Sequence, residues 1–179
     1  MRNEAAKPAP TLYTLGHSRH ALGDFIALLD KHGIVLVVDV RGQPYSRYNP
    51  QYNRERLERS LRAKGIDYAW RGEHLSGRPK QPEFYAANGE VLWDRLAESP
   101  ALLAALDELR EECCARRLAL VCAEEDPNRC HRRFLLTPPL IARGIEVLHV
   151  RGDGRLQDER SVRAGEESPE AARQQGLFD

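Results

Sequence analysis

Reactive side chains gather in one short segment in the second half of this chain. An apolar run ends at Cys122, Glu124 follows two residues later, and Cys130, His131 and Arg132 come after a polar turn. Thiols act as nucleophiles, carboxylates and imidazoles move protons, and guanidinium groups bind anions. In an open α/β sheet, ligands bind at the turns that leave the carboxyl ends of the strands. The segment therefore predicts an active site at such a turn.

Each of these residues has a chemical and a structural interpretation. We assign the acid/base role to Glu124, because a carboxylate beside a buried strand end can have a shifted pKa, although it could instead pair with an arginine. Cys122 is a second catalytic candidate, but a cysteine that ends an apolar run is most often a small buried hydrophobe. At the start of the next helix, His131 and the arginines would lower the pKa of Cys130, or Cys130 would simply pack inward. Arg132 at this helix start predicts an anion site.

Two familiar arrangements do not fit this segment. The spacing from Cys122 to Arg129 is one residue too long for the cysteine–arginine loop of phosphatases and sulfurtransferases, and the acids between them would repel a phosphate. His17 and His131 could assemble a zinc site with Cys122 and Cys130, but the sequence has no short Cys-x-x-Cys pair. We therefore predict no metal and no other cofactor.

Polar side chains also follow two earlier apolar runs. His17 and Ser18, after the first run, would act as a general base and a hydroxyl donor, or would form a turn and a helix cap. Asp39 and Arg41, after the second run, would bind substrate, or would pair with each other or with Arg132 to hold the sheet edge, which we favour for Asp39. Parallel strands end at one edge of a sheet, so these side chains should lie near Glu124. The catalytic candidates are thus His17, Asp39, Cys122 and Glu124.

A polar loop over residues 42–53 is rich in tyrosine and asparagine. Tyr48, Asn49 and Asn53 would stack on a base and hydrogen-bond a sugar, or the tyrosine rings would cover the edge of the sheet. A loop of this length is often functional. The candidates for binding a substrate or an anion are Ser18, Arg41, Tyr48, Asn49, Asn53, Cys130, His131 and Arg132.

The elements that must position these residues alternate along the chain. Apolar runs predict strands over residues 12–15, 34–40, 66–70, 118–122 and 145–150, and helical periodicity predicts helices over residues 24–32, 54–64, 91–98, 100–117 and 127–143. The last helix should bend at Pro138. This alternation predicts an α/β fold: a mostly parallel sheet of five or slightly more strands with helices on both faces, in a three-layer, Rossmann-like arrangement.

Composition limits the organisation of the chain and the classes of partner. The 179 residues are 41% hydrophobic and carry no net charge, which predicts one folded domain over residues 11–151 between flexible segments, 1–10 and 152–179. A chain without net charge has no global field that draws it to nucleic acid or to a membrane. We find no signal peptide, no membrane span and no disulfide framework, and we expect a cytoplasmic protein without a membrane partner.

Several motifs taken together resemble the family known as domain of unknown function 488. The matching pieces are Thr14–Ser18, Val38–Arg41, Asn49–Asn53, Leu75–Gly77, Leu120–Glu124 and Cys130–Arg132, spread over roughly residues 11–150. The family usually has two glycines where Ser76 and Gly77 stand. The resemblance implies an α/β fold and a shared site formed by the motif residues, and it implies no settled reaction.

The end of the chain carries a separate signal. Gln174, Leu177 and Phe178 resemble the short peptide by which bacterial polymerases and repair proteins bind the sliding clamp. Leu177 and Phe178 would fill an apolar pocket, and Gln174 would hydrogen-bond at its rim. The alternative is that Leu177 and Phe178 dock on the protein's own surface.

Together these features predict an enzyme that acts on nucleic acid or a nucleotide by hydrolase- or lyase-type acid/base chemistry. Arg41 and Arg132 would hold phosphate, the tyrosine-rich loop would engage a base, and His17 with Glu124 would transfer protons. One alternative is a cysteine-based redox or sulfur-transfer enzyme that uses one of the two cysteines of the segment. Another is a non-catalytic ligand-binding module linked to the sliding clamp.

Overall fold

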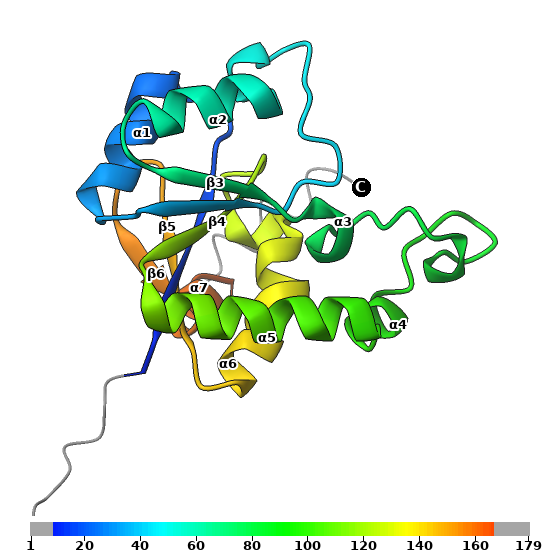
Figure 1. Cartoon of the computed structure of the whole chain (residues 1–179). Helices are drawn as coiled ribbons and strands as arrows, with labels where there is room; N and C mark the ends of the chain where they lie inside the picture. Colours follow the sequence, from blue (N-terminus) through cyan, green and yellow to red (C-terminus); the bar gives the residue numbers. More distant parts are fainter. Residues whose placement is uncertain (1–8, 167–179) are drawn as a thin grey trace, which may run out of the picture.

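Six strands form one sheet in the computed structural model, which describes residues 9–166 (Figure 1). The strands are β1 (Thr11–Gly16), β2 (Leu36–Asp39), β3 (Asp67–Trp70), β4 (Leu118–Cys122), β5 (Glu146–Val150) and β6 (Leu156–Asp158). The α-helices are α1 (Leu22–Lys31), α2 (Arg54–Arg62), α3 (Gly72–Leu75), α4 (Trp93–Ala97), α5 (Pro100–Ala115), α6 (Thr137–Ala142) and α7 (Glu159–Glu166). Shorter helical pieces are 3-10 helices at Pro50–Tyr52, Pro82–Phe84 and Pro127–Arg129, and a π-helical segment at Arg132–Leu136. The predicted α/β class is confirmed.

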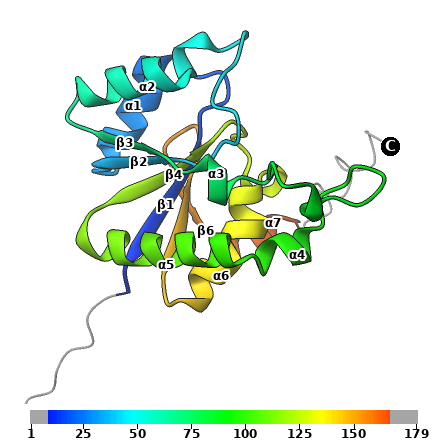
Figure 2. The ribbon, with the colours of Figure 1, turned by 45° about the vertical axis from the view of Figure 1, so that its right-hand side comes forward.

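The strand order is β3-β2-β4-β1-β5-β6, and β1 to β5 pair in parallel while β6 runs antiparallel to β5. Helices α1 and α2 cover one face of the sheet, and α5 and α6 cover the other (Figures 1 and 2). β1 and β4 are neighbours, but the chain leaves β1 toward α1 and leaves β4 toward α6. Their carboxyl ends therefore form a topological switch point, where α/β sheets bind ligands.

The buried strands explain why the sheet has a core on each side. Along β4, Leu118 and Leu120 pack on the α5 side, whereas Ala119 and Val121 pack against α1 and α2. Side chains alternate along a strand, so a run that is apolar throughout is buried on both faces. The same alternation places the side chain of Cys122 in the core on the α5 and α6 side.

The helix predicted over residues 127–143 is not continuous. A 3-10 helix at Pro127–Arg129, the π-helical segment Arg132–Leu136 and α6 replace it. Pro138 and Pro139 lack the N–H groups that an α-helix would use in its next turn, so the chain cannot keep α-helical hydrogen bonding through them. The backbone N–H of Thr137 reaches instead to the carbonyl of Arg132, which gives the wider π turn.

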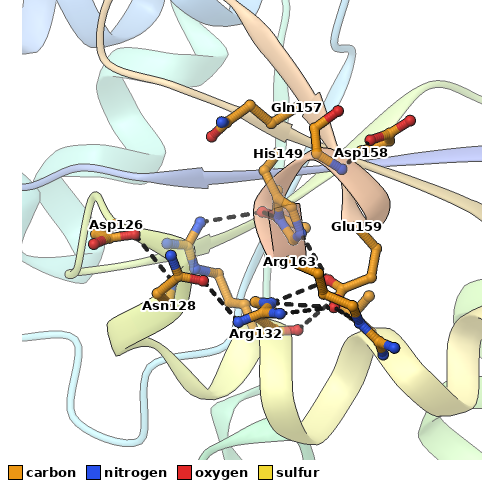
Figure 3. Close-up of polar contacts among 12 residues, drawn as sticks. Asp126, Asn128, Arg132, His149, Gln157, Asp158, Glu159 and Arg163 are labelled. Atoms are coloured by element: carbon orange, nitrogen blue, oxygen red, sulfur yellow. Dashed lines mark hydrogen bonds and ion pairs between the residues drawn. The ribbon is translucent and has the colours of Figure 1, made fainter. Parts of the chain in front are cut away.

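The fold also continues beyond residue 151, where the sequence analysis expected a flexible segment to begin. β6 adds to the sheet beside β5, and α7 follows it directly. The Glu159 carboxylate of α7 accepts a hydrogen bond from Arg163 at 2.9 Å (Figure 3). It also accepts hydrogen bonds from Arg133 at 3.0 to 3.2 Å. Backbone pairing and ion pairs hold this stretch against the rest of the fold. These interactions leave no apolar periodicity in the sequence, and that periodicity is the signal by which helices are predicted.

Two other sequence expectations concern membranes and the clamp-like peptide. None of the helices within residues 9–166 combines the length and the apolar character needed to cross a membrane. Gln174, Leu177 and Phe178 lie outside the described residues.

A buried histidine links β5 to the neighbouring strand and to α7. His149 is 1% exposed, and its Nδ1 lies 2.8 Å from the Thr14 hydroxyl. Burial and then the charge of Arg132 lower the pKa of His149 to about 4, although Glu159 acts in the opposite direction. The imidazole is therefore neutral at neutral pH, and its 3.7 Å approach to the Glu159 carboxylate is not an ion pair (Figure 3).

This pKa predicts a loss of stability in acid. Between the folded pKa of about 4 and the unfolded value of about 6.5, the unfolded chain binds more protons, so the free energy of unfolding falls as pH falls. We expect His149 to contribute roughly 1 kcal/mol per pH unit to this slope, and His149→Gln to remove that share. Urea unfolding of both proteins between about pH 4 and pH 7 measures it, and equal slopes would contradict the prediction.

Candidate functional site

Backbone hydrogen bonds between the β1 and β4 segments continue beyond the residues at which the two strands end. The backbone N–H groups of His17 and Ser18 donate to the carbonyls of Cys122 and Ala123, at 2.9 and 2.8 Å. A Cβ atom on Gly16 would lie 1.8 Å from the carbonyl oxygen of Glu124, so only glycine fits there. Ser18 has a φ of 43°, a left-handed conformation that is unusual for a serine. The two turns that carry predicted site residues are thus fused at the switch point.

Asp39 and Arg41 pair with each other, which is the structural interpretation that we favoured for Asp39. Arg41 donates through Nε and Nη2 to the two carboxylate oxygens, at 2.9 and 2.6 Å, and Nη2 also donates to the Tyr52 carbonyl. The Tyr68 hydroxyl donates to Asp39 at 2.7 Å. Asp39 is fully buried and Arg41 is 7% exposed, so both side chains serve the interior of the sheet edge.

His17 belongs to the same buried network. Its ring stacks on Tyr52 with the centroids 4.1 Å apart, and its Nε2 lies 3.2 Å from Nη1 of Arg41. Nδ1 lies 3.0 Å from the carbonyl of Ser18, so Nδ1 carries the hydrogen and Nε2 accepts from Arg41. Burial and then the charge of Arg41 lower the pKa of His17 to about 4. At 4% exposure and with both nitrogens engaged, His17 has no free atom to act as the general base predicted for it.

The second cluster forms around the two cysteines of the turn after β4. Sγ of Cys122 and Sγ of Cys130 lie 3.8 and 3.9 Å from Nδ1 of His131. Arg132, which is 1% exposed, donates from Nε to the Cys130 sulfur at 3.0 Å. The guanidinium also donates to the hydroxyl of Thr14 and to the carbonyl of Glu124. Arg132 is therefore occupied within the protein.

The thiols of Cys122 and Cys130 differ in pKa because different groups contact their sulfur atoms. The Cys122 thiol and the charge of Arg132 stabilise the Cys130 thiolate and hold the pKa of Cys130 well below its usual value, whereas the same thiol contact and burial raise the pKa of Cys122. The single Cys122 hydrogen has a second acceptor, because Oε2 of Glu124 lies 3.1 Å from Sγ. Cys130 is thus the anionic member of a buried pair, and the Glu124 side chain, which is exposed, marks the side that faces solvent.

The predicted site residues therefore fall into three places at one edge of the sheet. His17, Asp39 and Arg41 form one buried network, and the segment from Cys122 to Arg132 forms the second. Tyr48, Asn49 and Asn53 belong to a loop that abuts the first network through Tyr52, and Ser18 caps no helix, because α1 begins after Ala21. Because the guanidinium groups of Arg41 and Arg132 donate to acceptors within the protein, we do not retain these residues as phosphate ligands.

Sequence reasoning missed several partners of these networks. Tyr68, Thr14 and His149 are polar residues inside otherwise apolar strands, and that position was the available signal. The carbonyl of Leu75 accepts from Nε2 of His131 at 3.1 Å. Residue type does not reveal which backbone carbonyl will accept a hydrogen bond, so this partner could not be predicted. A Cβ on Gly77 would lie 2.6 Å from Cβ of His131, which explains the glycine of this motif.

The close approach at Gly16 gives a testable prediction. Gly16→Ala should lower the free energy of unfolding by about 3 kcal/mol or more, because the new methyl group meets a backbone carbonyl that cannot move aside. Gly23→Ala is the matched control, since nothing lies within 4 Å of its Cβ position in α1. That change should stabilise the helix by about 0.5–1 kcal/mol. Denaturant unfolding compares the two, and a tolerated Gly16→Ala would show that the turns are not fused as described.

Comparison with known proteins gives one match. The family model of domain of unknown function DUF488 matches residues 21–137, which is more than half of the chain and lies within the span of 11–150 on which the motifs were noted. No curated protein and no solved structure matches the chain. The motifs Leu75–Gly77 and Cys130–Arg132, which meet at His131, lie inside the matched region. The chain belongs to the DUF488 family.

Proposed function

We propose that this protein is an enzyme that acts on single-stranded nucleic acid at the carboxyl edge of its sheet. The observation that carries the proposal is Tyr48, whose side chain is 86% exposed on a loop that borders the predicted site. A tyrosine usually buries its ring, and a ring held out in solvent offers a face on which a base can stack. Stacking accepts any base, so it suits a single strand, whose bases are unpaired.

The loop that carries Tyr48 is held in place by its own hydrogen bonds. The backbone N–H of Ser46 donates to Oδ1 of Asn53 at 2.7 Å, and the Ser46 hydroxyl accepts from the backbone of Tyr48 and Asn49. The N–H of Arg54 returns to the carbonyl of Pro44 at 3.0 Å. A loop fixed before binding loses little conformational entropy when a base stacks on it. The Asn53 side chain thus supports the loop in the free protein.

One arginine lies near this ring, and others follow along α2. The guanidinium of Arg47 lies 5.9 Å from the Tyr48 ring centroid, and that of Arg54 lies over Trp70 at 4.9 Å. Further along α2, Arg56 and Arg59 are exposed. Within residues 9–166, none of these four arginines forms an ion pair with a carboxylate, although the charges of Arg54 and Arg59 help to lower the pKa of Glu55. Exposed arginines together with an exposed ring are the combination that binds a strand of phosphates and bases.

Glu124 supplies the acid/base group in this proposal. Of the predicted catalytic residues, Glu124 is the one whose side chain is exposed, whereas His17, Asp39 and Cys122 are buried. A cysteine-based redox or sulfur-transfer reaction is less well supported, because Cys122 and Cys130 are 5% and 2% exposed and a thiolate nucleophile must reach its substrate.

Binding should depend on Tyr48. Loss of one stacked base costs about 1–3 kcal/mol, so Tyr48→Ala should weaken binding of a labelled oligothymidine at least roughly fivefold. Arg47→Ala should weaken binding and also reduce its dependence on salt. Fluorescence anisotropy with single strands, duplex and mononucleotide measures these effects. Phe134→Ala, which removes another exposed aromatic ring, is the control and should bind as wild type does. Equal affinity in all variants would refute the proposed surface.

Turnover should depend on Glu124. Glu124→Gln keeps the shape of the side chain and removes its capacity to take up a proton, so it should retain oligonucleotide binding and lose any strand or base cleavage by about 100-fold or more. Denaturing gels and chromatography of single-stranded DNA and RNA incubated with each protein detect the products. Cleavage that persists in the variant would remove Glu124 from the reaction.

A further inference from the structure

The turn after β4 brings three metal-ligating atoms together. Sγ of Cys122, Sγ of Cys130 and Nδ1 of His131 all lie within 4.8 Å of one another. The two sulfur-to-nitrogen distances are 3.8 and 3.9 Å. A tetrahedral zinc ion with Zn–S bonds of about 2.3 Å and a Zn–N bond of about 2.0–2.1 Å would hold such atoms about 3.6 Å apart. The two sulfur-to-nitrogen distances would need to change by only a few tenths of an ångström.

The histidine is already oriented for coordination. Nε2 of His131 lies 3.1 Å from the carbonyl of Leu75, so Nε2 carries the hydrogen and the lone pair of Nδ1 points at the two sulfurs. Metal-bound histidines in proteins are commonly held by a carbonyl or carboxylate at the other nitrogen. Gly77 allows this loop to come close, since a Cβ there would lie 2.6 Å from the His131 side chain. The Leu75–Gly77 motif thus has the role of an outer support for His131.

We propose that Cys122, Cys130 and His131 bind a single divalent metal ion of the zinc type, with a fourth coordination position open to solvent beside Glu124. Two thiolates and an imidazole favour zinc over magnesium or calcium, which prefer oxygen ligands. The charges also balance, because two thiolates and the Glu124 carboxylate offset a dication and the guanidinium of Arg132. This inference is independent of nucleic-acid binding.

Binding requires the loss of a proton from the pair of thiols. Arg132 donates to the Cys130 sulfur and so holds it ready as a thiolate. Cys122 must give up its thiol hydrogen when the metal binds, and the Glu124 carboxylate, 3.1 Å from that sulfur, can pass the proton to solvent. No electron is transferred in this step.

The open position distinguishes this centre from a structural one. Within residues 9–166, the cluster contains three such ligands, whereas structural zinc sites have four protein ligands. A water in the fourth position would be activated toward hydrolysis, with Glu124 beside it as the proton acceptor. The absence of a Cys-x-x-Cys pair does not oppose the site, because the turn from the end of β4 to the π-helical segment folds the two cysteines together.

The test is metal binding by the full chain, reduced and freed of metal. Zinc titration against a chromophoric chelator should give one ion per chain, and Co²⁺ should give the charge-transfer band of thiolate ligation. Cys130→Ser and His131→Gln should each weaken zinc binding by more than the roughly 10–100-fold that loss of an outer support costs. Cys114→Ser, which changes an exposed cysteine on α5, is the matched control and should bind zinc as wild type does.

If the cysteine variants do not fold, His131→Gln still tests metal binding, because His131 is only half-buried. Circular dichroism verifies the fold of each variant, and zinc should raise the melting temperature of the wild type but not that of His131→Gln. Substoichiometric zinc in the wild type, unchanged zinc affinity in a folded His131→Gln, or a Cys122–Cys130 disulfide that forms in its place would overturn the proposal. Oligonucleotide binding by the metal-free protein, measured in parallel, keeps a failure here separate from a failure of the proposed function.

Discussion

The buried guanidinium of Arg132 sets the arrangement of the sheet edge. A charge that is 1% exposed would cost several kcal/mol if it met no acceptors. Arg132 meets the sulfur of Cys130, the hydroxyl of Thr14 and the carbonyl of Glu124. These acceptors come from the turn before the π-helical segment, from β1 and from the turn after β4. One side chain therefore fixes the relative positions of three pieces of chain, and the Thr14 hydroxyl extends the contact to His149 on β5.

The hydrogen bonds that buried arginines make within the protein determine which side-chain atoms are left to contact a ligand. Arg41 is held by Asp39 and by the carbonyl of Tyr52, as Arg132 is held by its own partners. Within the proposed function, anion binding falls to exposed arginines such as Arg47, on the loop after β2, and Arg56, on α2. At the end of β4, sulfur, imidazole and the exposed carboxylate of Glu124 remain. Those groups suit a metal ion or a proton transfer better than they suit direct phosphate binding.

The sequence was sufficient for the sheet and for the gathering of these polar residues at its carboxyl edge, because both depend on local pattern. Apolar runs such as Leu118–Cys122 predict strands buried on two faces, and the carboxyl ends of parallel strands must share an edge. It was not sufficient for the roles of His17, Arg41 and Arg132. Residue type does not show whether a donor is satisfied by another part of the chain, and their partners are distant in sequence. β6 and α7 were missed because ion pairs and backbone pairing hold them, rather than an apolar stripe.

The two clusters lie on opposite sides of the sheet, and this limits what can engage both. The side chains of Cys122 and Cys130 pack in the core covered by α5 and α6, whereas Tyr52, on which His17 stacks, packs in the core covered by α1 and α2. The loop with Tyr48 belongs to the second side, and the exposed Glu124 follows the end of β4 between them. A ligand that touches Tyr48 and also reaches the cysteine turn must cross the edge of the sheet. A flexible single strand can follow such a path, whereas a duplex is too stiff to bend over so short a distance. Within the proposed function, the topology thus favours an extended chain as substrate, with stacking on one side of the edge and reaction on the other.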